Sequence, residues 1–300
     1  MENIPNFLID KLNEEYGDDI SKEIVDGYCT ERISSFRINT LKSSLDEVED
    51  ILKSNGVLDY EIDSYKGVDR ILIKKELEER VRELDIYKEG KIYFQSLSSM
   101  LPPLFLDLNE GEDFLDMCAA PGGKTTEIAA LINNKANITA IEFNKQRYEK
   151  LKYNIEMQGA KCSVLQKDSR RLDDFLRFDK ILLDAPCSGS GTLSDKENNS
   201  NYTQNLINKC KSMQESMLKK ACKLVKKNQI IVYSTCSILK EENEEIVNKI
   251  LSEYKDIYVE EIELKEDDKL RLLPSTIKGT ITVMPNKYYE GFYIAKLRKK

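Results

Sequence analysis

Short apolar runs that alternate with longer amphipathic stretches are the feature that most constrains the fold of this chain. Such runs are typical of strands buried on both faces of a parallel sheet, and the stretches between them have the period of helices. Strands that alternate with helices imply a parallel sheet with right-handed crossover connections. From residue 113 onward we therefore predict an α/β domain built on a mostly parallel sheet with an antiparallel ending.

The same periodicity places the individual elements of this region. The predicted strands are 113–117, 137–142, 163–165, 180–184, 229–234, 257–264, 279–284 and 291–297. The predicted helices are 125–133, 145–158, 203–226 and 240–254. The polar stretch 193–202 is predicted to be a mobile loop.

Residues 1–90 follow a different pattern and are predicted to form a separate small α+β domain, with residues 91–300 as the second domain. Helices are expected at 3–16 and 18–29, a strand at 36–39, a helix from Ser44 to Lys53, and two strands around Gly67. Ser44 and Glu47 have the spacing of a capping box, which favours a helix start at this point.

The composition is that of a globular protein, because 33% of the 300 residues are charged and 40% are hydrophobic. No apolar run reaches the length of a membrane span, and the first residues lack the pattern of a secretory signal. Seven cysteines, no histidine and no Cys-x-x-Cys argue against a disulfide framework and a structural zinc site. We expect a metal-free protein in a reducing cytoplasm, with no membrane association.

The charges are unevenly distributed. The formal net charge is −7, yet residues 209–227 contain seven lysines and one acidic residue, and four of the last five residues are basic: Lys296, Arg298, Lys299 and Lys300. Acidic residues concentrate at 46–50 and 241–245. Taken alone, such runs most often indicate solvated faces. The alternative for the two basic segments is that they contact phosphates of a nucleic acid.

Two cysteines sit in short loops that each follow an apolar run. Cys187 lies in Asp-Ala-Pro-Cys-Ser-Gly after the strand predicted at 180–184, and Cys236 lies in Ser-Thr-Cys-Ser after the strand predicted at 229–234. Ligands of open α/β sheets bind beyond the carboxyl ends of the strands, so the two thiols can meet over one substrate. Because the chain has no histidine, such a thiol must be activated by its position, by a cation or by a helix N-terminus.

A third loop of small residues follows the strand predicted at 113–117. It ends in Gly-Gly-Lys-Thr, but Cys118 stands where a phosphate loop needs its first glycine, and the dinucleotide pattern Gly-x-Gly-x-x-Gly is absent. A small-residue turn between strand and helix lets a cofactor approach the backbone. Glu142, about 20 residues further on, suits two ribose hydroxyls, and Asp168 suits an adenine amine. The loop therefore indicates a nucleoside cofactor.

The motifs Asp116–Thr126, Asp184–Gly191 and Tyr233–Ile238 together resemble those of the RsmB/NSUN family of RNA cytosine-5 methyltransferases. The similarity extends from about Gly90 to Leu297, and Phe36–Lys42 resembles the N-terminal domain of the family. The resemblance implies a Rossmann-like fold that binds S-adenosylmethionine, with residues 1–90 positioning RNA. It assigns cofactor contacts to Cys118, Ala119, Ala120, Pro121, Gly122, Gly123, Lys124, Glu142, Asp168 and Asp184.

The resemblance also implies a covalent mechanism. It gives Cys236 the role of a nucleophile that attacks C6 of cytosine, and Cys187 the role of aiding proton removal and product release. We expect Lys124 to be the cation nearest the thiols, and Asp184 to hydrogen-bond the base. Any other lone cysteine is most simply a small buried hydrophobe, and we assign this role to Cys29, Cys162, Cys210 and Cys222.

The expected partner is ribosomal or transfer RNA, bound by a monomer. Two alternatives stay open at this point. One is a methyltransferase-fold RNA-binding or ribosome-assembly factor without activity. The other is a methyltransferase that acts on a different atom or base, although an Asn/Asp-Pro-Pro-aromatic motif is typical of adenine and exocyclic-amine methyltransferases and this chain has Asp-Ala-Pro-Cys instead.

Overall fold

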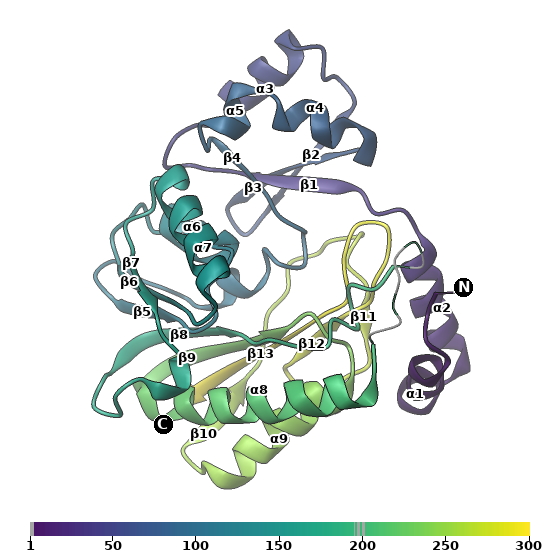
Figure 1. The fold of residues 1–300 in the computed structure, drawn as a ribbon, viewed down its shortest axis with the longest axis vertical. Coiled ribbons are helices and arrows are strands. Elements are labelled where there is room, and N and C mark those ends of the chain that lie inside the picture. The colour runs from purple at the N-terminus through teal and green to yellow at the C-terminus, as the bar shows by residue number, and fades with distance from the viewer. Residues whose placement is uncertain (1–2, 195, 197–198, 200–201) are drawn as a thin grey trace. The chain divides into compact units, whose positions relative to one another are not determined.

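The computed structural model describes residues 3–194, 196, 199 and 202–300, and Figure 1 shows the fold. The chain forms two compact units, of which unit 1 comprises Met1–Arg32 with Leu172–Lys300 and unit 2 comprises Ile33–Arg171. In the sequence, unit 2 is inserted between the two segments of unit 1. The predicted division instead cuts the chain once, at residue 90, and it stays a prediction. The mobile loop predicted over 193–202 lies in part outside the described residues.

Unit 2 contains a four-stranded antiparallel sheet in the order β2-β3-β1-β4. Its apolar side chains, among them Phe36, Ile71 and Ile92, pack against Val48 and Leu52 of the first helix of this unit. That helix begins where expected, because the Ser44 hydroxyl accepts a hydrogen bond from the backbone N–H of Glu47. The elements are β1 (Ser34–Ile38), α3 (Leu45–Ser54), β2 (Tyr60–Tyr65), β3 (Val68–Ile73), α4 (Glu78–Arg82), α5 (Asp85–Lys88) and β4 (Ile92–Phe94).

The remainder of unit 2 has three parallel strands in the order β5-β6-β7, connected by helices. Leu151 and Ile155 of the second helix pack against Ala140 of the central strand and against the loop residues Ala119 and Ala120. The loop after β5, Glu142 and Asp168, which are predicted to bind a cofactor, therefore lie at the carboxyl ends of three neighbouring parallel strands. The elements are β5 (Asp113–Asp116), α6 (Gly123–Leu131), β6 (Asn137–Glu142), α7 (Lys145–Gln158) and β7 (Ser163–Gln166), with 3-10 turns at Lys75–Leu77, Pro102–Phe105 and Ser169–Arg171.

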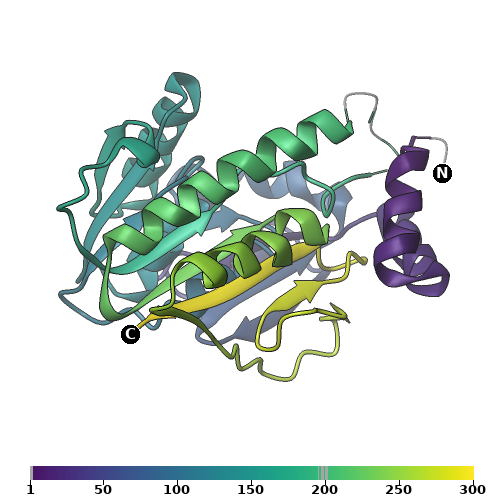
Figure 2. The ribbon, with the colours of Figure 1, turned by 90° about the horizontal axis from the view of Figure 1, so that it is seen from below.

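Unit 1 contains a pair of parallel strands, and the strands that follow them in the sheet are antiparallel. β8 (Phe178–Asp184) and β9 (Val225–Thr235) run parallel, and β13 (Phe292–Lys299) is antiparallel to β9. β10 and β12 each pair with β13, and β11 pairs with β12. Two helices lie side by side along one face of these strands, as Figure 2 shows. The remaining elements are α8 (Gln204–Leu224), α9 (Glu244–Glu253), β10 (Ile257–Glu260), β11 (Leu272–Leu273), β12 (Ile281–Val283) and a 3-10 turn at Lys240–Glu242.

The first two helices, α1 (Asn6–Tyr16) and α2 (Asp18–Cys29), belong to unit 1. Leu8 and Leu12 of α1 and Ile24 of α2 share an apolar core with Ile238 and Leu239, which follow β9. Hydrophobic burial therefore attaches the start of the chain to a segment more than 200 residues away.

Most predicted elements are confirmed, and the strand 137–142 and the helix 145–158 have the bounds expected. The helix expected over 240–254 is interrupted, because Asn243 has φ −116° and ψ −92° and separates the 3-10 turn from α9. The sequence analysis missed α4, α5, β4 and β11, which at two to five residues are too short to establish a period. Within the described part of the chain, no helix has the length and hydropathy required to cross a membrane.

Candidate active site

Unit 1 brings the two motif cysteines into contact. β8 ends at Asp184 and β9 ends at Thr235, and their parallel register pairs Asp184 with Ser234. Cys187 and Cys236 follow these strand ends, and their Sγ atoms lie 2.7 Å apart. Both cysteines are free and half-buried. The meeting of two thiols that the strand ends predict is thus present in the structure.

The surroundings of Cys187 disfavour its thiolate. The hydrogen bond with Cys236 and burial raise the pKa of Cys187 well above that of an ordinary thiol. Cys187 is therefore protonated at neutral pH in this arrangement, and either thiol can donate in the contact between the two sulfurs.

The two thiol loops, Cys187–Gly191 and Cys236–Ile238, are joined by several further hydrogen bonds. The N–H of Gly191 donates to the carbonyl of Cys236 at 2.9 Å, and the N–H of Ile238 donates to Ser190 Oγ at 2.9 Å. Ser190 Oγ and Ser237 Oγ lie 2.8 Å apart. These contacts hold the cysteines in a fixed mutual position.

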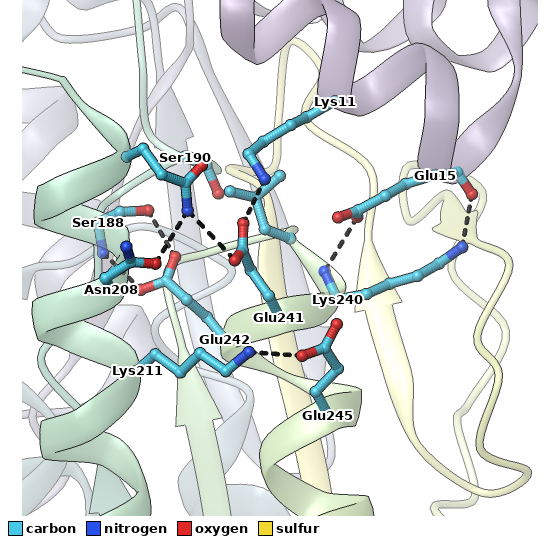
Figure 3. Close-up of polar contacts among 12 residues, drawn as sticks. Lys11, Glu15, Ser188, Ser190, Asn208, Lys211, Lys240, Glu241, Glu242 and Glu245 are labelled. Carbon is cyan, nitrogen blue, oxygen red and sulfur yellow. Dashed lines mark hydrogen bonds and ion pairs between the residues drawn. The ribbon is translucent and has the colours of Figure 1, made fainter.

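A buried carboxylate, Glu242, contacts both thiol loops, and Figure 3 shows it beside Ser188. Glu242 has no exposed surface and accepts hydrogen bonds from Ser188 N (2.9 Å), Ser188 Oγ (2.5 Å) and Ser237 Oγ (2.7 Å). Gln214 Nε2 of α8 also donates to it, at 3.0 Å. The acidic run 241–245 was expected to be solvated, and for Glu242 this expectation is wrong, because neighbouring hydroxyl, amide and backbone donors replace water around the carboxylate.

Sequence reasoning missed Glu242, although a signal was present. Leu239, Glu242, Ile246 and Ile250 are spaced by three and four residues, and all four are buried. A carboxylate within an apolar stripe at helical spacing indicates a buried acid rather than a solvated one.

Asn243 supports the Cys236 loop from the same side. Its Oδ1 accepts from Thr235 Oγ1 at 2.6 Å, and its Nδ2 donates to the carbonyl of Ser237 at 2.9 Å. The side chain thereby bridges the residues on either side of Cys236. The bridge is made at the residue where the chain departs from helical geometry.

The N-terminal helices contact both thiol loops from the outer side. Tyr16 donates its hydroxyl to the carbonyl of Ile238 at 2.5 Å, and Tyr28 donates to the carbonyl of Ser190 at 2.6 Å. Figure 3 shows Lys11 and Glu15 of α1 reaching the turn at Lys240–Glu242. Residues before 33 therefore help to shape the thiol site, which the sequence analysis did not anticipate.

Asp184 lies at the end of β8, and its Oδ1 accepts a hydrogen bond from Ser234 Oγ at 2.8 Å. The side chain is half-buried and therefore reachable at the strand end. Its role toward the base or the cofactor stays a prediction.

In unit 2, a buried aspartate shapes the small-residue loop after β5. Asp116 is 1% exposed, and it accepts hydrogen bonds from Thr125 Oγ1 at 2.7 Å and from the N–H of Cys118 at 3.3 Å. Gly122 has φ +112°, and a Cβ at this position would lie 3.1 Å from Leu151 Cδ1. The turn into α6 therefore needs a glycine, and Asp116 joins its two ends.

The carbonyl groups of this loop are held by side chains from other elements. Arg147 and Asn154 of α7 donate to the carbonyls of Ala120 and Pro121, each at 2.7 Å. The buried Arg37 of β1 donates to the carbonyl of Gly123 at 3.2 Å and to Thr126 Oγ1 at 2.7 Å. Lys124 donates to Ser99 Oγ at 2.7 Å. The loop backbone is thus fixed independently of a ligand.

Two further acids are predicted to bind the cofactor, one at the end of β6 and one just after β7. Glu142 ends β6, is 5% exposed, and accepts from the N–H of Asn144 at 2.7 Å. Asp168 forms a bidentate pair with Arg170, whose Nε and Nη2 lie 2.9 and 2.7 Å from its two oxygens, and this contact lowers the pKa of Asp168. An adenine amine at Asp168 would have to share the carboxylate with Arg170.

Several side chains of the basic segments form ion pairs. In α8, Lys219 forms ion pairs with Glu215 and Glu253, Lys220 with Asp174, and Lys211 with Glu245. At the C-terminus, Lys296 and Arg298 both pair with Glu260. The structure therefore favours the interpretation of these segments as solvated, ion-paired faces over a role in phosphate binding.

Outside the motifs, Cys210 and Cys222 are buried as expected. Cys162 is half-buried, and burial raises its pKa to about 12. The expectation of burial is wrong for Cys29, which is exposed because it is the last residue of α2. Among the described residues, no group of three or more Cys, Asp or Glu side chains could hold a metal ion.

Comparison with known proteins agrees with the motifs. A family described as 16S rRNA methyltransferase RsmB/F matches residues 103–298. The chain is 32% identical over 308 residues to the ribosomal RNA small subunit methyltransferase F of Vibrio vulnificus (strain YJ016). This alignment covers 99% of the chain and 64% of that relative, so the chain spans less than two thirds of its length.

Solved structures give the same result for the fold. A methyltransferase homologue from Pyrococcus horikoshii superposes with a TM-score of 0.83 at 29% identity, covering 99% of this chain and 96% of that one. The NSun6 protein of Pyrococcus horikoshii, solved with SFG, superposes with a TM-score of 0.86 at 24% identity, covering 99% of each chain. This similarity confirms the predicted Rossmann-like methyltransferase fold, which here has a small antiparallel sheet near the N-terminus.

Proposed function

Because the chain belongs to the RsmB/F family of 16S rRNA methyltransferases, we propose that it transfers the methyl group of S-adenosylmethionine to C5 of a cytosine in ribosomal RNA. The observation that carries the proposal is the contact between the thiols of Cys187 and Cys236 at the ends of two parallel strands. Cytosine C5 is a weak nucleophile, so its methylation needs a covalent partner, and two thiols meet that need.

The reaction begins when the Cys236 thiolate attacks C6 and forms a C–S bond. The electron pair of the C5–C6 double bond then makes C5 nucleophilic, and C5 would take the methyl group as the sulfonium S–CH3 bond breaks, leaving S-adenosylhomocysteine. Loss of the C5 proton restores the double bond and expels the Cys236 thiolate. Cys187 takes the C5 proton after its own S–H proton has left to solvent, and the raised pKa of Cys187 makes that thiolate a stronger base than an ordinary one.

Bound S-adenosylmethionine supplies an electrophilic methyl group on a sulfonium. The loop Cys118–Lys124 fits a nucleoside cofactor, since its carbonyls are held from outside and Gly122 leaves the turn without a Cβ. Glu142 would accept hydrogen bonds from the ribose hydroxyls, and Asp168 and Asp184 would be further polar contacts of the cofactor. Lys124 holds the loop through Ser99 and adds positive charge there.

The two thiols can be separated by substitution. In Cys236→Ala, methylation is abolished and no covalent RNA adduct forms. In Cys187→Ala, attack and methyl transfer proceed but release fails, so a protein–RNA adduct accumulates on denaturing, reducing gels. Cys210→Ala is the matched control, because it removes a thiol of unit 1 that lies outside both thiol loops.

The assay also distinguishes the alternatives. An adduct in Cys236→Ala instead would make Cys187 the nucleophile, and full turnover in both variants would exclude the covalent mechanism. Bisulfite sequencing of total RNA with and without the protein identifies the modified base. Protected cytosines in transfer RNA would assign the activity to that substrate, and their absence from all RNA would favour a binding factor without activity.

A further inference from the structure

We propose that Glu242 is a positioning residue that holds the two thiol loops in their reactive arrangement. This inference deepens the proposed function and rests on it. Glu242 contributes no atom to the reaction, and it acts through the serines that follow each cysteine, Ser188 and Ser237.

The geometry places Glu242 where it contacts both loops at once. Oε1 accepts from the N–H of Ser188 at 2.9 Å, and Oε2 accepts from Ser188 Oγ at 2.5 Å and Ser237 Oγ at 2.7 Å. Gln214 adds a second connection, because its Nε2 donates to Glu242 at 3.0 Å and to the carbonyl of Pro186 at 2.9 Å. Glu242 is thus bound to a residue directly after each cysteine.

Stability alone does not account for a carboxylate at this position. Glu242 has no exposed surface, and the donors that contact it in the described part of the chain are neutral hydroxyl, amide and backbone groups. Burial of a carboxylate with only neutral donors costs free energy that an apolar residue would avoid. Such a cost is typical of groups retained for positioning or chemistry.

The charge of Glu242 also acts on the thiols. Together with the Cys236 hydrogen bond and burial, its negative charge contributes to the raised pKa of Cys187. The carboxylate therefore favours the protonated form of Cys187. Replacing Glu242 should disturb both the position of the loops and the division of roles between the two sulfurs.

The test compares Glu242→Ala, Glu242→Gln and Glu244→Gln with the wild-type chain. Glu244 is the matched control, because it is 2% exposed and lies on α9, yet its carboxylate accepts from Ser275 at 3.3 Å. The first readout is the ratio of Cys187 to Cys236 alkylation by iodoacetamide at pH 7.5 (chosen as about neutral), measured by peptide mass spectrometry. We expect a change of at least about threefold in Glu242→Ala and none in Glu244→Gln.

The second readout is steady-state methylation. We expect kcat to fall at least about tenfold in Glu242→Ala while KM for S-adenosylmethionine stays within about twofold, and Glu242→Gln to recover part of kcat because its carbonyl still accepts hydrogen bonds. If Glu242→Ala does not fold, Glu242→Gln carries both readouts. An unchanged alkylation ratio, or kcat reduced equally in Glu244→Gln, would overturn the inference. A wild-type chain that methylates no cytosine would instead refute the proposed function, and the alkylation ratio would still test Glu242.

Discussion

Gly191→Ala is the substitution whose effect the structure defines most sharply. A Cβ on Gly191 would lie 2.0 Å from the carbonyl oxygen of Gly291, which is 1.4 Å short of the 3.4 Å at which ordinary contact begins. The obstacle is backbone on both sides, so no side-chain rotation relieves it. The two segments must separate, and the separation breaks two hydrogen bonds, from Gly191 N to Cys236 O at 2.9 Å and from Gly291 N to Gly191 O at 2.8 Å.

Leaving each of these buried groups without a partner costs about 1–3 kcal/mol, so Gly191→Ala should lower the free energy of unfolding by about 2–6 kcal/mol. Gly189→Ala is the control from the same loop, since its φ of +79° makes alanine strained while the nearest atom is a side-chain oxygen 3.3 Å away. Its expected cost is about 1–2 kcal/mol. Urea denaturation followed by circular dichroism measures both values.

Gly191→Ala should also loosen the contact between Cys187 and Cys236, because it releases the backbone bond that joins their loops. Faster alkylation of both cysteines in the folded variant would report this change. A loss below about 1 kcal/mol in Gly191→Ala, or one smaller than in Gly189→Ala, would show that the close approach of the two glycines does not constrain the site.

Three further predictions follow from single contacts. Glu142→Ala should weaken S-adenosylmethionine binding by about 1–3 kcal/mol in calorimetry, and unchanged affinity would remove Glu142 from the cofactor site. Replacing Lys219, Lys220 and Lys223 by Gln should leave the salt dependence of RNA binding unchanged, because each lysine pairs with a carboxylate, whereas a flatter dependence would restore α8 as a phosphate contact. Burial raises the pKa of Glu15 to about 7, so the folded state binds more protons than the unfolded state, and the free energy of unfolding should fall by up to about 3 kcal/mol from pH 4.5 to 7. Glu15→Gln should reduce the total fall by that amount without abolishing it, because burial also raises the pKa of Glu127 to about 8 and gives a fall of the same sign. A thermal melt series with an unchanged fall would assign it to other groups.

The sequence by itself determined the strands, the helices and the loops that carry the chemistry. Strand 137–142 and helix 145–158 follow from hydrophobic period and turn residues, which act over a few neighbouring positions. The meeting of Cys187 and Cys236 could likewise be predicted, because each follows a buried strand and the carboxyl ends of parallel strands lie at one edge of a sheet.

Tertiary structure alone decided which groups support those loops. Glu242 belongs to an acidic run whose composition suggests solvation, yet packing beneath two loops buries it among neutral donors. The sequence of α8 suggests a basic face, but folding places carboxylates from α9 and Asp174 beside its lysines. Tyr28 reaches the carbonyl of Ser190 across 162 positions of sequence. Period and propensity carry no information over such separations, because long-range contacts arise only when whole elements pack to bury their apolar faces.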